Sequence, residues 1–599
     1  MPPDPESPNY NELVQPLARA ISFGLLVCAA IVPAGSALAQ MDMSAHAMGT
    51  ENQIPPADLP VPLKMTGIGN IHMRISATPE AQLWFDQGLN LIHDYWDYES
   101  ARAFQQAIRV DPQCAICYWG LYRAESFYHG LAQGYAIPAL QNAVKLKGHA
   151  ARRERLFIEA TEIQAGLRTD LKPTDARAAD LQLRRKLAKD NPKDVEAQLF
   201  LAERVDQKEE LAILEAILKD DPGNSAANHM YIHALEAGPH PEKALRAAEA
   251  LATAAPASGH MVHMPGHIYS RMGDYPKAEQ AFAASTLVDE RYMQEQHVTP
   301  DNDWNYVHNL MYAIANLMEE GKLNKATELS LKLTGARGER ESTLYTYSTR
   351  DSISRLDPRL PVALRTGDWK QVPRLLPAAE TLTRFPNLEF LARQLATFAE
   401  GMAALQEHNV TAAEGAALRF DAGLWRMSQQ AKTSGPMAAM PAAKAPDGPP
   451  TLQLMSDAQL QPLMSTLTIM SQELQASLLA AQGKPADAHS LFLKAAQAEK
   501  ALGYREPPSY IRPVGETEAA AMLSLGSWVD ARAAFEQALL ERPRSGFALY
   551  GIAFTSEKSG NADAARKEYP EFLAAWKDAD PALDQVIHAR SYLAFGHVP

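Results

Sequence analysis

Two pairs of histidines at a fixed separation set the strongest constraint on how this sequence can fold. His229 and His233 form one H-x-x-x-H pair, and His263 and His267 form a second pair 34 residues later. A spacing of four residues places both side chains of a pair on one face of a helix. A period of 34 residues is that of a helix–turn–helix repeat, in which stacked hairpins bury a continuous core. The spacing therefore predicts a helical array with the two pairs at equivalent places.

The residues around the second pair fit a hairpin repeat that begins at Gly259. Small and aromatic residues then occupy the positions at which the two helices of a hairpin touch, namely Gly266, Tyr269, Ala278 and Phe282 at positions 8, 11, 20 and 24. The preceding repeat begins at Ser225. The same pattern recurs near Ala81 and in two C-terminal repeats that begin 34 residues apart, at Arg512 and Gly546. In these features the chain resembles tetratricopeptide-repeat (TPR) proteins.

Longer motifs make the resemblance more specific. The stretches FDQGLNLIHDY, DPQCAICYWG, HMVHMPGHIYSRMGDY, VHNL and EPPSYIRPVGE are spread over most of residues 80–580. They resemble those of large exported bacterial TPR proteins of unsettled biochemical role. The resemblance implies an all-α, TPR-type α-solenoid of antiparallel helical hairpins that form a right-handed superhelix. It also implies that the first helix of each repeat lines a concave groove, with positions 2, 5, 9 and 12 facing into it.

Changes in composition divide the chain into six segments. Residues 1–39 are predicted to be a signal peptide, because an apolar run over 21–31 precedes an A-x-A cleavage pattern that ends at Ala39. The remaining segments are a flexible Met/Pro-rich tail (40–75), an N-terminal TPR-like solenoid with the His-rich repeats (76–345), a TPR-like helical middle (346–430), a low-complexity linker (431–452), and C-terminal TPR repeats with a capping helix (453–599). We therefore expect a periplasmic or secreted protein without a transmembrane anchor in its mature form.

The net charge of the chain narrows the class of partner. At pH 7 the chain carries a formal charge of −14. Proteins that bind nucleic acids or anionic membranes usually present a basic surface. We therefore expect no nucleic-acid partner. Because TPR arrays mostly bind proteins or peptides in their concave groove, a protein or peptide partner is the first functional prediction.

The histidines support a second prediction, a metal site. The resemblance to TPR repeats places both pairs at positions 5 and 9 of neighbouring first helices, so the side chains are expected to converge. Imidazole is a preferred ligand of zinc and copper. We therefore predict a metal site made by His229, His233, His263 and His267, with zinc or copper as the cofactor. Further residues are expected in the groove or around the ligands, namely Glu236, His260, His308 and Asn309.

Two other interpretations of the histidines remain open. Each histidine could be a packing residue that forms a hydrogen bond, or it could be part of a polar groove that binds a peptide carboxylate. A metal-dependent hydrolase would need a general base, for which Glu236 is the local candidate. The chain has no H-E-x-x-H, G-x-S-x-G or P-loop motif, and no residue is assigned a catalytic role. The prediction is thus an exported scaffold, with a periplasmic zinc- or copper-binding protein or a metal-dependent hydrolase as the alternatives.

Two cysteines remain after the predicted signal peptide. Cys114 and Cys117 form a C-A-I-C stretch at the expected start of a helix. Three roles are open, which are packing in the helix, a local disulfide, and a redox or metal site. Tyr118 follows the second cysteine, so the stretch is not a C-x-x-C-H haem attachment site.

Overall fold

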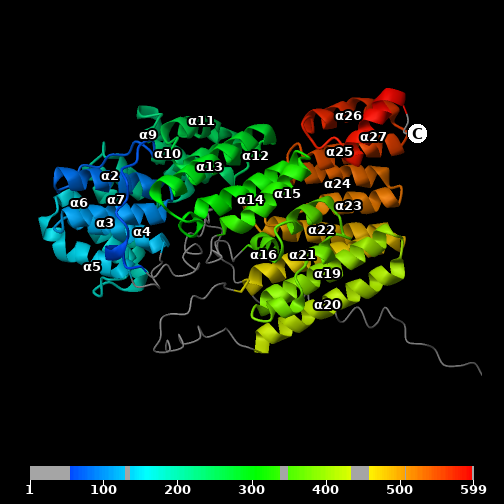
Figure 1. The fold of residues 1–599 in the computed structure, drawn as a ribbon, viewed down its shortest axis with the longest axis horizontal. Helices are drawn as coiled ribbons and strands as arrows, with labels where there is room; N and C mark the ends of the chain where they lie inside the picture. The colour runs from blue at the N-terminus through cyan, green and yellow to red at the C-terminus, as the bar shows by residue number, and fades with distance from the viewer. Residues whose placement is uncertain (1–53, 129–134, 338–347, 434–456, 506, 597–599) are drawn as a thin grey trace, which may run out of the picture.

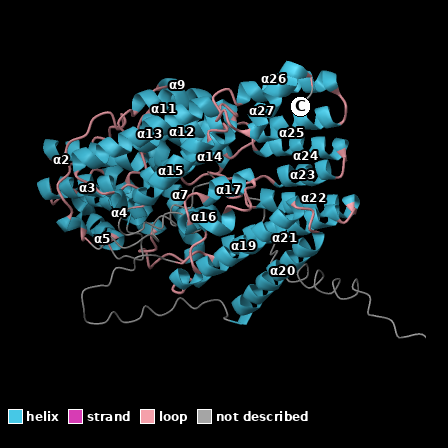
Figure 2. Cartoon of the chain, turned by 45° about the vertical axis from the view of Figure 1, so that its right-hand side comes forward, coloured by secondary structure: helices cyan, strands magenta, loops and turns pink. Residues whose placement is uncertain are grey.

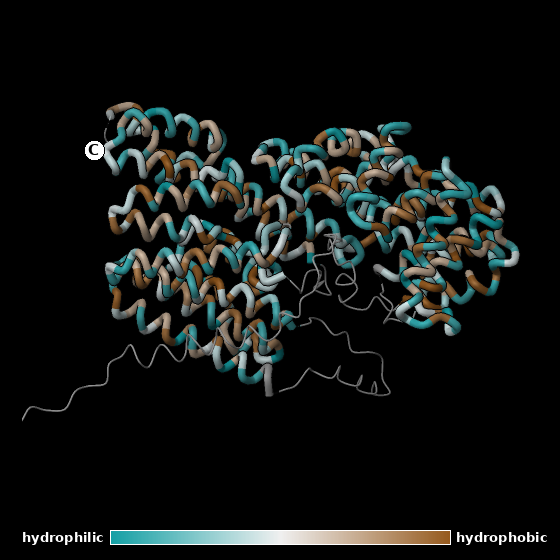
Figure 3. The backbone as a smooth tube through the Cα atoms, turned by 180° about the vertical axis from the view of Figure 1, so that it is seen from behind, coloured by the Kyte–Doolittle hydropathy of each residue, from teal (hydrophilic) through white to brown (hydrophobic). Residues whose placement is uncertain are grey.

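The computed structural model describes residues 54–128, 135–337, 348–433, 457–505 and 507–596. Throughout these ranges the regular structure is helical, and no β-strand occurs (Figure 2). Hydrophobic and hydrophilic residues are interspersed along the helices (Figure 3). Most helices bury one face against their neighbours, whereas the helix over Trp304–Glu319 is buried on nearly all sides. The predicted all-α, TPR-type solenoid is confirmed.

The N-terminal half is an array of helical hairpins (Figure 1). Its helices are α2 (Pro79–His93), α3 (Asp97–Val110), α4 (Ala115–Tyr128), α5 (Ala136–Leu146), α6 (Arg152–Gln164), α7 (Pro173–Asp190), α8 (Val195–Ala202), α9 (Gln207–Asp220), α10 (Ser225–Glu236), α11 (Leu245–Ala254), α12 (Gly259–Arg271), α13 (Tyr275–Gln296), α14 (Trp304–Glu319) and α15 (Leu323–Ala336). Short 3-10 helices lie between or before them, namely η2 (Pro56–Asp58), η4 (Lys147–His149), η5 (Pro241–Ala244) and η6 (Pro300–Asn302).

The middle and C-terminal parts continue the array. They contain α16 (Thr349–Leu356), α17 (Leu360–Thr366), α18 (Val372–Leu375), η7 (Ala379–Leu382), α19 (Pro386–Gln406), α20 (Val410–Thr433), α21 (Leu460–Ala481), α22 (Pro485–Ala501), α23 (Val514–Ser524), α24 (Trp528–Glu541), α25 (Gly546–Lys558), α26 (Ala562–Ala575) and α27 (Asp584–Phe595). The last helix packs on α26, where a capping helix is expected.

Glycine at repeat position 8 lets the two helices of a hairpin approach closely. A Cβ atom on Gly266 would lie 2.3 Å from the ring of Phe282, and one on Gly88 would lie 2.9 Å from the ring of Phe104. Real Cβ atoms do not approach other heavy atoms so closely. These are the contacts between positions 8 and 24 that the repeat pattern predicts.

The N-terminal extended segment differs from its prediction. Residues 54–75 fall in the predicted flexible tail, but apart from η2 they lie extended along the helices and are held there by hydrogen bonds. The backbone N–H of Leu63 donates to Gln296 Oε1 (3.0 Å), and that of Ile71 donates to Asn90 Oδ1 (2.8 Å). Apolar side chains of the segment are buried, among them Leu59, Ile68, Ile71 and Met73. Burial of these side chains, which are scattered among prolines, orders a segment that has no helical period of its own.

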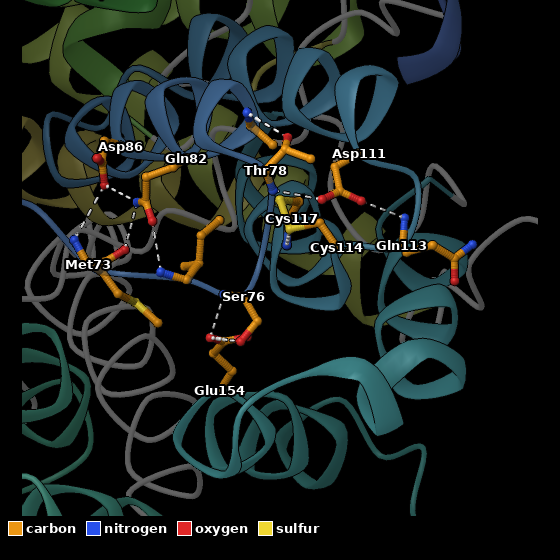
Figure 4. The surroundings of a disulfide bond; sticks show 12 residues. Met73, Ser76, Thr78, Gln82, Asp86, Asp111, Gln113, Cys114, Cys117 and Glu154 are labelled. Carbon is orange, nitrogen blue, oxygen red and sulfur yellow. Dashed lines mark hydrogen bonds between the residues drawn. A yellow bond between two sulfur atoms is a disulfide. The ribbon is translucent and has the colours of Figure 1, made fainter.

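Cys114 and Cys117 are joined by a disulfide at the start of α4 (Figure 4). Both residues are buried. The neighbouring turn is fixed to the extended segment, because the backbone N–H of Thr78 donates to Asp111 Oδ2 (2.9 Å). Of the three roles left open by the sequence, the structure contains the local disulfide.

Several predictions concern residues outside the described ranges. The signal peptide over 1–39, the first part of the tail and most of the linker over 431–452 are among them; helix α20 ends at Thr433, just inside that linker. None of the helices in the described part of the chain is both long enough and apolar enough to span a bilayer.

A buried ion network fastens the C-terminal repeats to the N-terminal half. The Arg365 guanidinium donates to both oxygens of Glu319 (2.8 Å each) and to both oxygens of Glu516 (2.6 and 2.9 Å). Burial raises the pKa of Glu319, but the charge of Arg365 outweighs it and holds that pKa below its usual range. The indole N–H of Trp576 donates to the Glu319 carbonyl (2.8 Å). The two halves therefore meet at α14 and its turn into α15.

Replacing Arg365 with alanine tests the importance of this network. The change leaves Glu319 and Glu516 buried together without the guanidinium that forms ion pairs with both, and breaking a buried pair in this way costs about 3–5 kcal/mol. We expect a loss of that size in the free energy of unfolding, measured by urea denaturation with circular dichroism. The control is Arg419→Ala, which removes an exposed pair with Glu400 and changes stability by about 0–1 kcal/mol. Equal effects of the two substitutions would contradict the assignment.

Candidate metal centre

Six histidines gather on the inner faces of three successive first helices. Helix α10 carries His229 and His233; helix α12 carries His260, His263 and His267; and helix α14 carries His308. They form two groups, within each of which the potential ligand atoms lie within 4.8 Å of one another. The first histidine group is His229, His233 and His260, and the second histidine group is His263, His267 and His308.

The two groups are built by the same rule. Each combines positions 5 and 9 of one repeat with position 2 of the next repeat. The four predicted ligands are therefore divided between the two groups, two in each. His260 and His308, which the sequence placed around the ligands, complete the groups as third members. The groups are neighbours, since the ring centroids of His260 and His308 lie 5.7 Å apart.

The imidazoles are removed from solvent. Five of the six residues are at most 3% exposed, and the side chain of His233 is 11% exposed. Burial lowers the pKa of His229, His260 and His263 well below the ordinary value, and nearby imidazoles lower it further. In the absence of a bound cation these three side chains are neutral at pH 7. Each then has one nitrogen that donates and one that carries a lone pair.

In the first histidine group, every Nδ1 atom faces an oxygen acceptor. His229 Nδ1 lies 2.5 Å from the backbone carbonyl of His93, and His233 Nδ1 lies 2.7 Å from Glu236 Oε1. His260 Nδ1 lies 3.1 Å from Asn305 Oδ1. The Asn305 amide is oriented by its own donation to Asp289 Oδ2 (2.9 Å), so its oxygen faces the imidazole. The proton of each ring is therefore assigned to Nδ1.

Two members of the second histidine group, His263 and His267, have the same arrangement. His263 Nδ1 lies 2.8 Å from Asn309 Oδ1, and His267 Nδ1 lies 2.7 Å from Glu236 Oε2. The amide of Asn309 donates to the Phe282 carbonyl (2.9 Å) and to a threonine hydroxyl, which turns its oxygen toward His263. Asn309 thus lies where the sequence predicted, beside the histidines.

The consequence is that Nε2 lone pairs point at one another. The Nε2 atoms of His229 and His233 lie 3.0 Å apart, and those of His263 and His267 lie 2.7 Å apart. With both protons on Nδ1, neither contact can be a hydrogen bond between neutral rings. Two nitrogens bound to one tetrahedral zinc ion at about 2.0–2.1 Å would be about 3.3 Å apart. A metal ion between the nitrogens would remove the repulsion.

Glu236 links the two groups. One carboxylate oxygen accepts from His233 and the other from His267, and the residue is 3% exposed. Burial raises the pKa of Glu236, but the two imidazoles outweigh this and lower it strongly. Carboxylates in this position orient metal-binding imidazoles and increase their basicity. Because both oxygens are occupied and the pKa is low, Glu236 is poorly suited to the role of general base considered from sequence.

Aromatic rings cover both groups. Tyr95 packs on His229 (ring centroids 4.7 Å apart), and Tyr312 stacks on His267 (4.7 Å, interplanar angle 13°). Tyr95 has a left-handed backbone conformation (φ 57°), which is unfavourable for a bulky residue. The indole N–H of Trp304 donates to its carbonyl (2.5 Å) and helps to hold it there.

Sequence reasoning missed three of these residues, Tyr95, Asn305 and Tyr312. Asn305 and Asn309 are four residues apart on α14, on the face that also bears His308. This N-x-x-H-N spacing could have indicated a helix face that supplies acceptors to the histidines. Tyr95 follows the first helix of its repeat, in a turn for which the sequence carries no comparable signal.

Comparisons with known proteins identify no family. No protein-family model matches the chain, and no curated protein matches it. Among solved structures, yeast Tom70 is 12% identical and aligns over 86% of this chain and 95% of its own, with a TM-score of 0.30. Human IFIT1 bound to m7Gppp-AAAA is 14% identical over 83% and 97%, with a TM-score of 0.32. The Cut9–Hcn1 complex gives 12% identity over 76% and 98%, and a TM-score of 0.23.

The start of α12 allows a specific test of the packing beneath the histidines. A Cβ atom on Gly259 would lie 1.6 Å from Asp289 Oδ1, whereas one on Gly335 would meet nothing within 4 Å. We expect Gly259→Ala to displace Asp289 and to lower stability by about 1–3 kcal/mol. Gly335→Ala, in helix α15, should leave stability unchanged or raise it by up to about 1 kcal/mol. Thermal unfolding of both variants measures this, and a neutral Gly259→Ala would show that the packing there is looser than described.

Proposed function

We propose that this protein binds two transition-metal ions, one in each histidine group. The observation that carries the proposal is the repeated orientation of the rings, in which Nδ1 faces an oxygen acceptor and Nε2 faces the other histidines. An imidazole that serves only in packing has no reason to aim its lone pair at another lone pair. The recurrence of this arrangement in two successive repeats, with one carboxylate shared between them, supports the same conclusion.

Zinc and copper are the metals that suit these ligands. Three imidazole nitrogens and no thiolate or carboxylate ligand favour zinc or copper over calcium or magnesium. Structural zinc sites usually have four protein ligands, whereas catalytic zinc sites have three and leave one position open. Each histidine group supplies three, so each ion would retain a position for water or another small ligand. Hydrolysis remains the alternative function, with a general base other than Glu236.

The helical-repeat scaffold also has surfaces for a protein or peptide partner. The part of the concave surface that carries positions 5 and 9 is buried, so a peptide cannot lie on those histidines as it would in an open groove. We therefore propose that any macromolecular partner binds elsewhere on the array. We also propose that the protein acts outside the cytoplasm; the disulfide between Cys114 and Cys117 supports an oxidising compartment.

Elemental analysis of the protein tests the metal proposal directly. We expect about two equivalents of zinc or copper in protein that begins at Gln40 and is purified without a His-tag or chelator. The double variant His263→Ala/His267→Ala should lose one equivalent and keep the other, because its substitutions lie in one group only. The control His240→Ala removes an exposed imidazole that contacts Glu242 and should keep both. Folded wild-type protein that takes up no metal on titration would refute the proposal.

Substitution of Glu236, whose carboxylate is shared by the two histidine groups, tests whether it orients the imidazole rings of His233 and His267. The amide of Glu236→Gln has one oxygen, so it can accept from only one of His233 and His267. Loss of such a partner typically weakens metal binding about 10- to 100-fold. We expect one of the two sites to weaken by about this factor in competition titrations with a chromogenic chelator. Glu242→Gln is the matched control on an exposed residue, and equal behaviour of the two variants would argue against orientation by Glu236.

A further inference from the structure

A separate pocket lies where the two halves of the protein meet. Its walls come from α12, α13 and α14 on one side and from α16, the end of α22, the segment after it and the end of α24 on the other. The volume is about 140 Å³, similar to an engineered cavity of about 150 Å³ that accommodates benzene. The pocket is therefore of a size for a small molecule, and we call it the arginine pocket after three of its residues, Arg271, Arg350 and Arg542.

Two of these arginines form no ion pair with a carboxylate of the described part of the chain. Arg350 is 3% exposed, and its one described hydrogen bond goes to the Pro508 carbonyl (2.8 Å). Arg542 donates to the carbonyls of Tyr510 (2.9 Å) and Glu541 (3.0 Å). Among the described residues, no carboxylate forms an ion pair with either guanidinium. Carboxylates stabilise the buried guanidinium of Arg365. A buried Arg350 without an ion pair, beside the partly exposed Arg542, therefore calls for an anion.

Arg271 adds a third positive charge at the same pocket. It donates to the backbone carbonyls of Glu236 (3.0 Å) and Gly238 (3.2 Å) and lies over the ring of Tyr504, 5.2 Å from its centroid. No carboxylate of the described residues pairs with it. The hydrogen bonds to these two carbonyls connect Arg271, which lines the pocket, to the end of the helix that carries His229 and His233.

The acidic residues of the pocket do not cancel these charges. Glu319 forms its ion pair with Arg365, which also pairs with Glu516, and not with an arginine of the pocket. Burial raises the pKa of Glu499 to about 8, so this carboxyl is largely protonated at neutral pH. Glu541 is partly exposed to solvent. Burial, followed by the charge of Arg542, lowers the pKa of Arg350 to about 9, while Glu319 acts in the opposite direction; Arg350 is therefore protonated at neutral pH.

We propose that the arginine pocket binds a small organic anion, whose carboxylate or phosphate group is held by Arg350 and Arg542. Guanidinium groups are well suited to both oxyanions. The rings of Tyr312 and Tyr504 and the ring of Pro508 provide flat, apolar walls for a compact body attached to that group. This site is distinct from the histidine groups and does not depend on a bound metal. Tyr312 is shared, since it lines the pocket and stacks on His267.

Calorimetric titration of the full mature chain tests the proposal. The probes are inorganic phosphate, benzoate and phenyl phosphate, with benzamide as the neutral control of the same shape as benzoate. We expect saturable binding of one equivalent of at least one anion and none of benzamide. Preference for benzoate identifies a carboxylate site, and preference for the two phosphates identifies a phosphate site. Absence of binding by all three anions would overturn the proposal.

Substitutions separate this site from direct binding to a metal. Arg350→Gln and Arg542→Gln should each weaken anion binding at least tenfold, whereas Arg185→Gln, on an exposed residue paired with Glu209, should not. The titrations are made on metal-free and metal-loaded protein. Binding that survives both arginine substitutions but disappears in His263→Ala/His267→Ala would place the anion on a metal ion and overturn the proposal.

Stability of the ligand-free protein gives a measurement that does not depend on ligand binding. If Arg350 is retained to bind an anion, Arg350→Met should leave the midpoint of thermal unfolding unchanged or raise it, because an unpaired buried charge is removed. A lower midpoint for Arg350→Met, together with unchanged anion binding by Arg542→Gln, would assign Arg350 a structural role and overturn the proposal.

Discussion

The carboxylate of Glu236 is the contact on which the functional centre of this protein depends. It accepts from one imidazole of each histidine group, through one oxygen to His233 and the other to His267. A buried carboxylate between two imidazoles fixes which nitrogen of each ring carries the proton. The remaining nitrogens then face inward, and their lone pairs can be satisfied by a metal cation. The chemistry of the centre follows from where these protons are held.

The repeat architecture explains why there are two groups. Each group needs positions 5 and 9 of one first helix and position 2 of the next, and stacked hairpins place these positions side by side. The third helix, α14, ends the series by supplying His308 together with the acceptors Asn305 and Asn309. The same stacking buries the centre, which lowers the effective dielectric constant and makes every unsatisfied polar atom costly. This explains why five of the six histidines have an oxygen acceptor at Nδ1.

The C-terminal half contributes one side of the second proposed site, the arginine pocket. It docks on α14 through Arg365 and Trp576, and the docking encloses the arginine pocket beside the ring of Tyr312. In a protein with a net charge of −14, three arginines of this pocket form no ion pair with any carboxylate that the structure describes. The ring of Tyr312 therefore lies between the second histidine group, proposed to bind a cation, and the arginine pocket, proposed to bind an anion. The two sites are adjacent because the two halves of the solenoid meet at α14.

The sequence by itself determined the helical repeats and the inward placement of the histidines. The 34-residue period sets the stacking and the spacing of four sets a shared helix face, while the inward direction of that face is what the resemblance to TPR repeats implies. Glu236, His260, His308 and Asn309, which the sequence suggested as neighbours of the pairs, lie beside them in the structure. Only the tertiary structure decided the division into two groups of three, because the acceptors for Nδ1 come from distant residues. The His93 carbonyl, for example, lies 136 residues from His229 in sequence. The arginine pocket likewise joins residues 350 and 542, whose proximity depends on how the whole superhelix closes and on no local pattern.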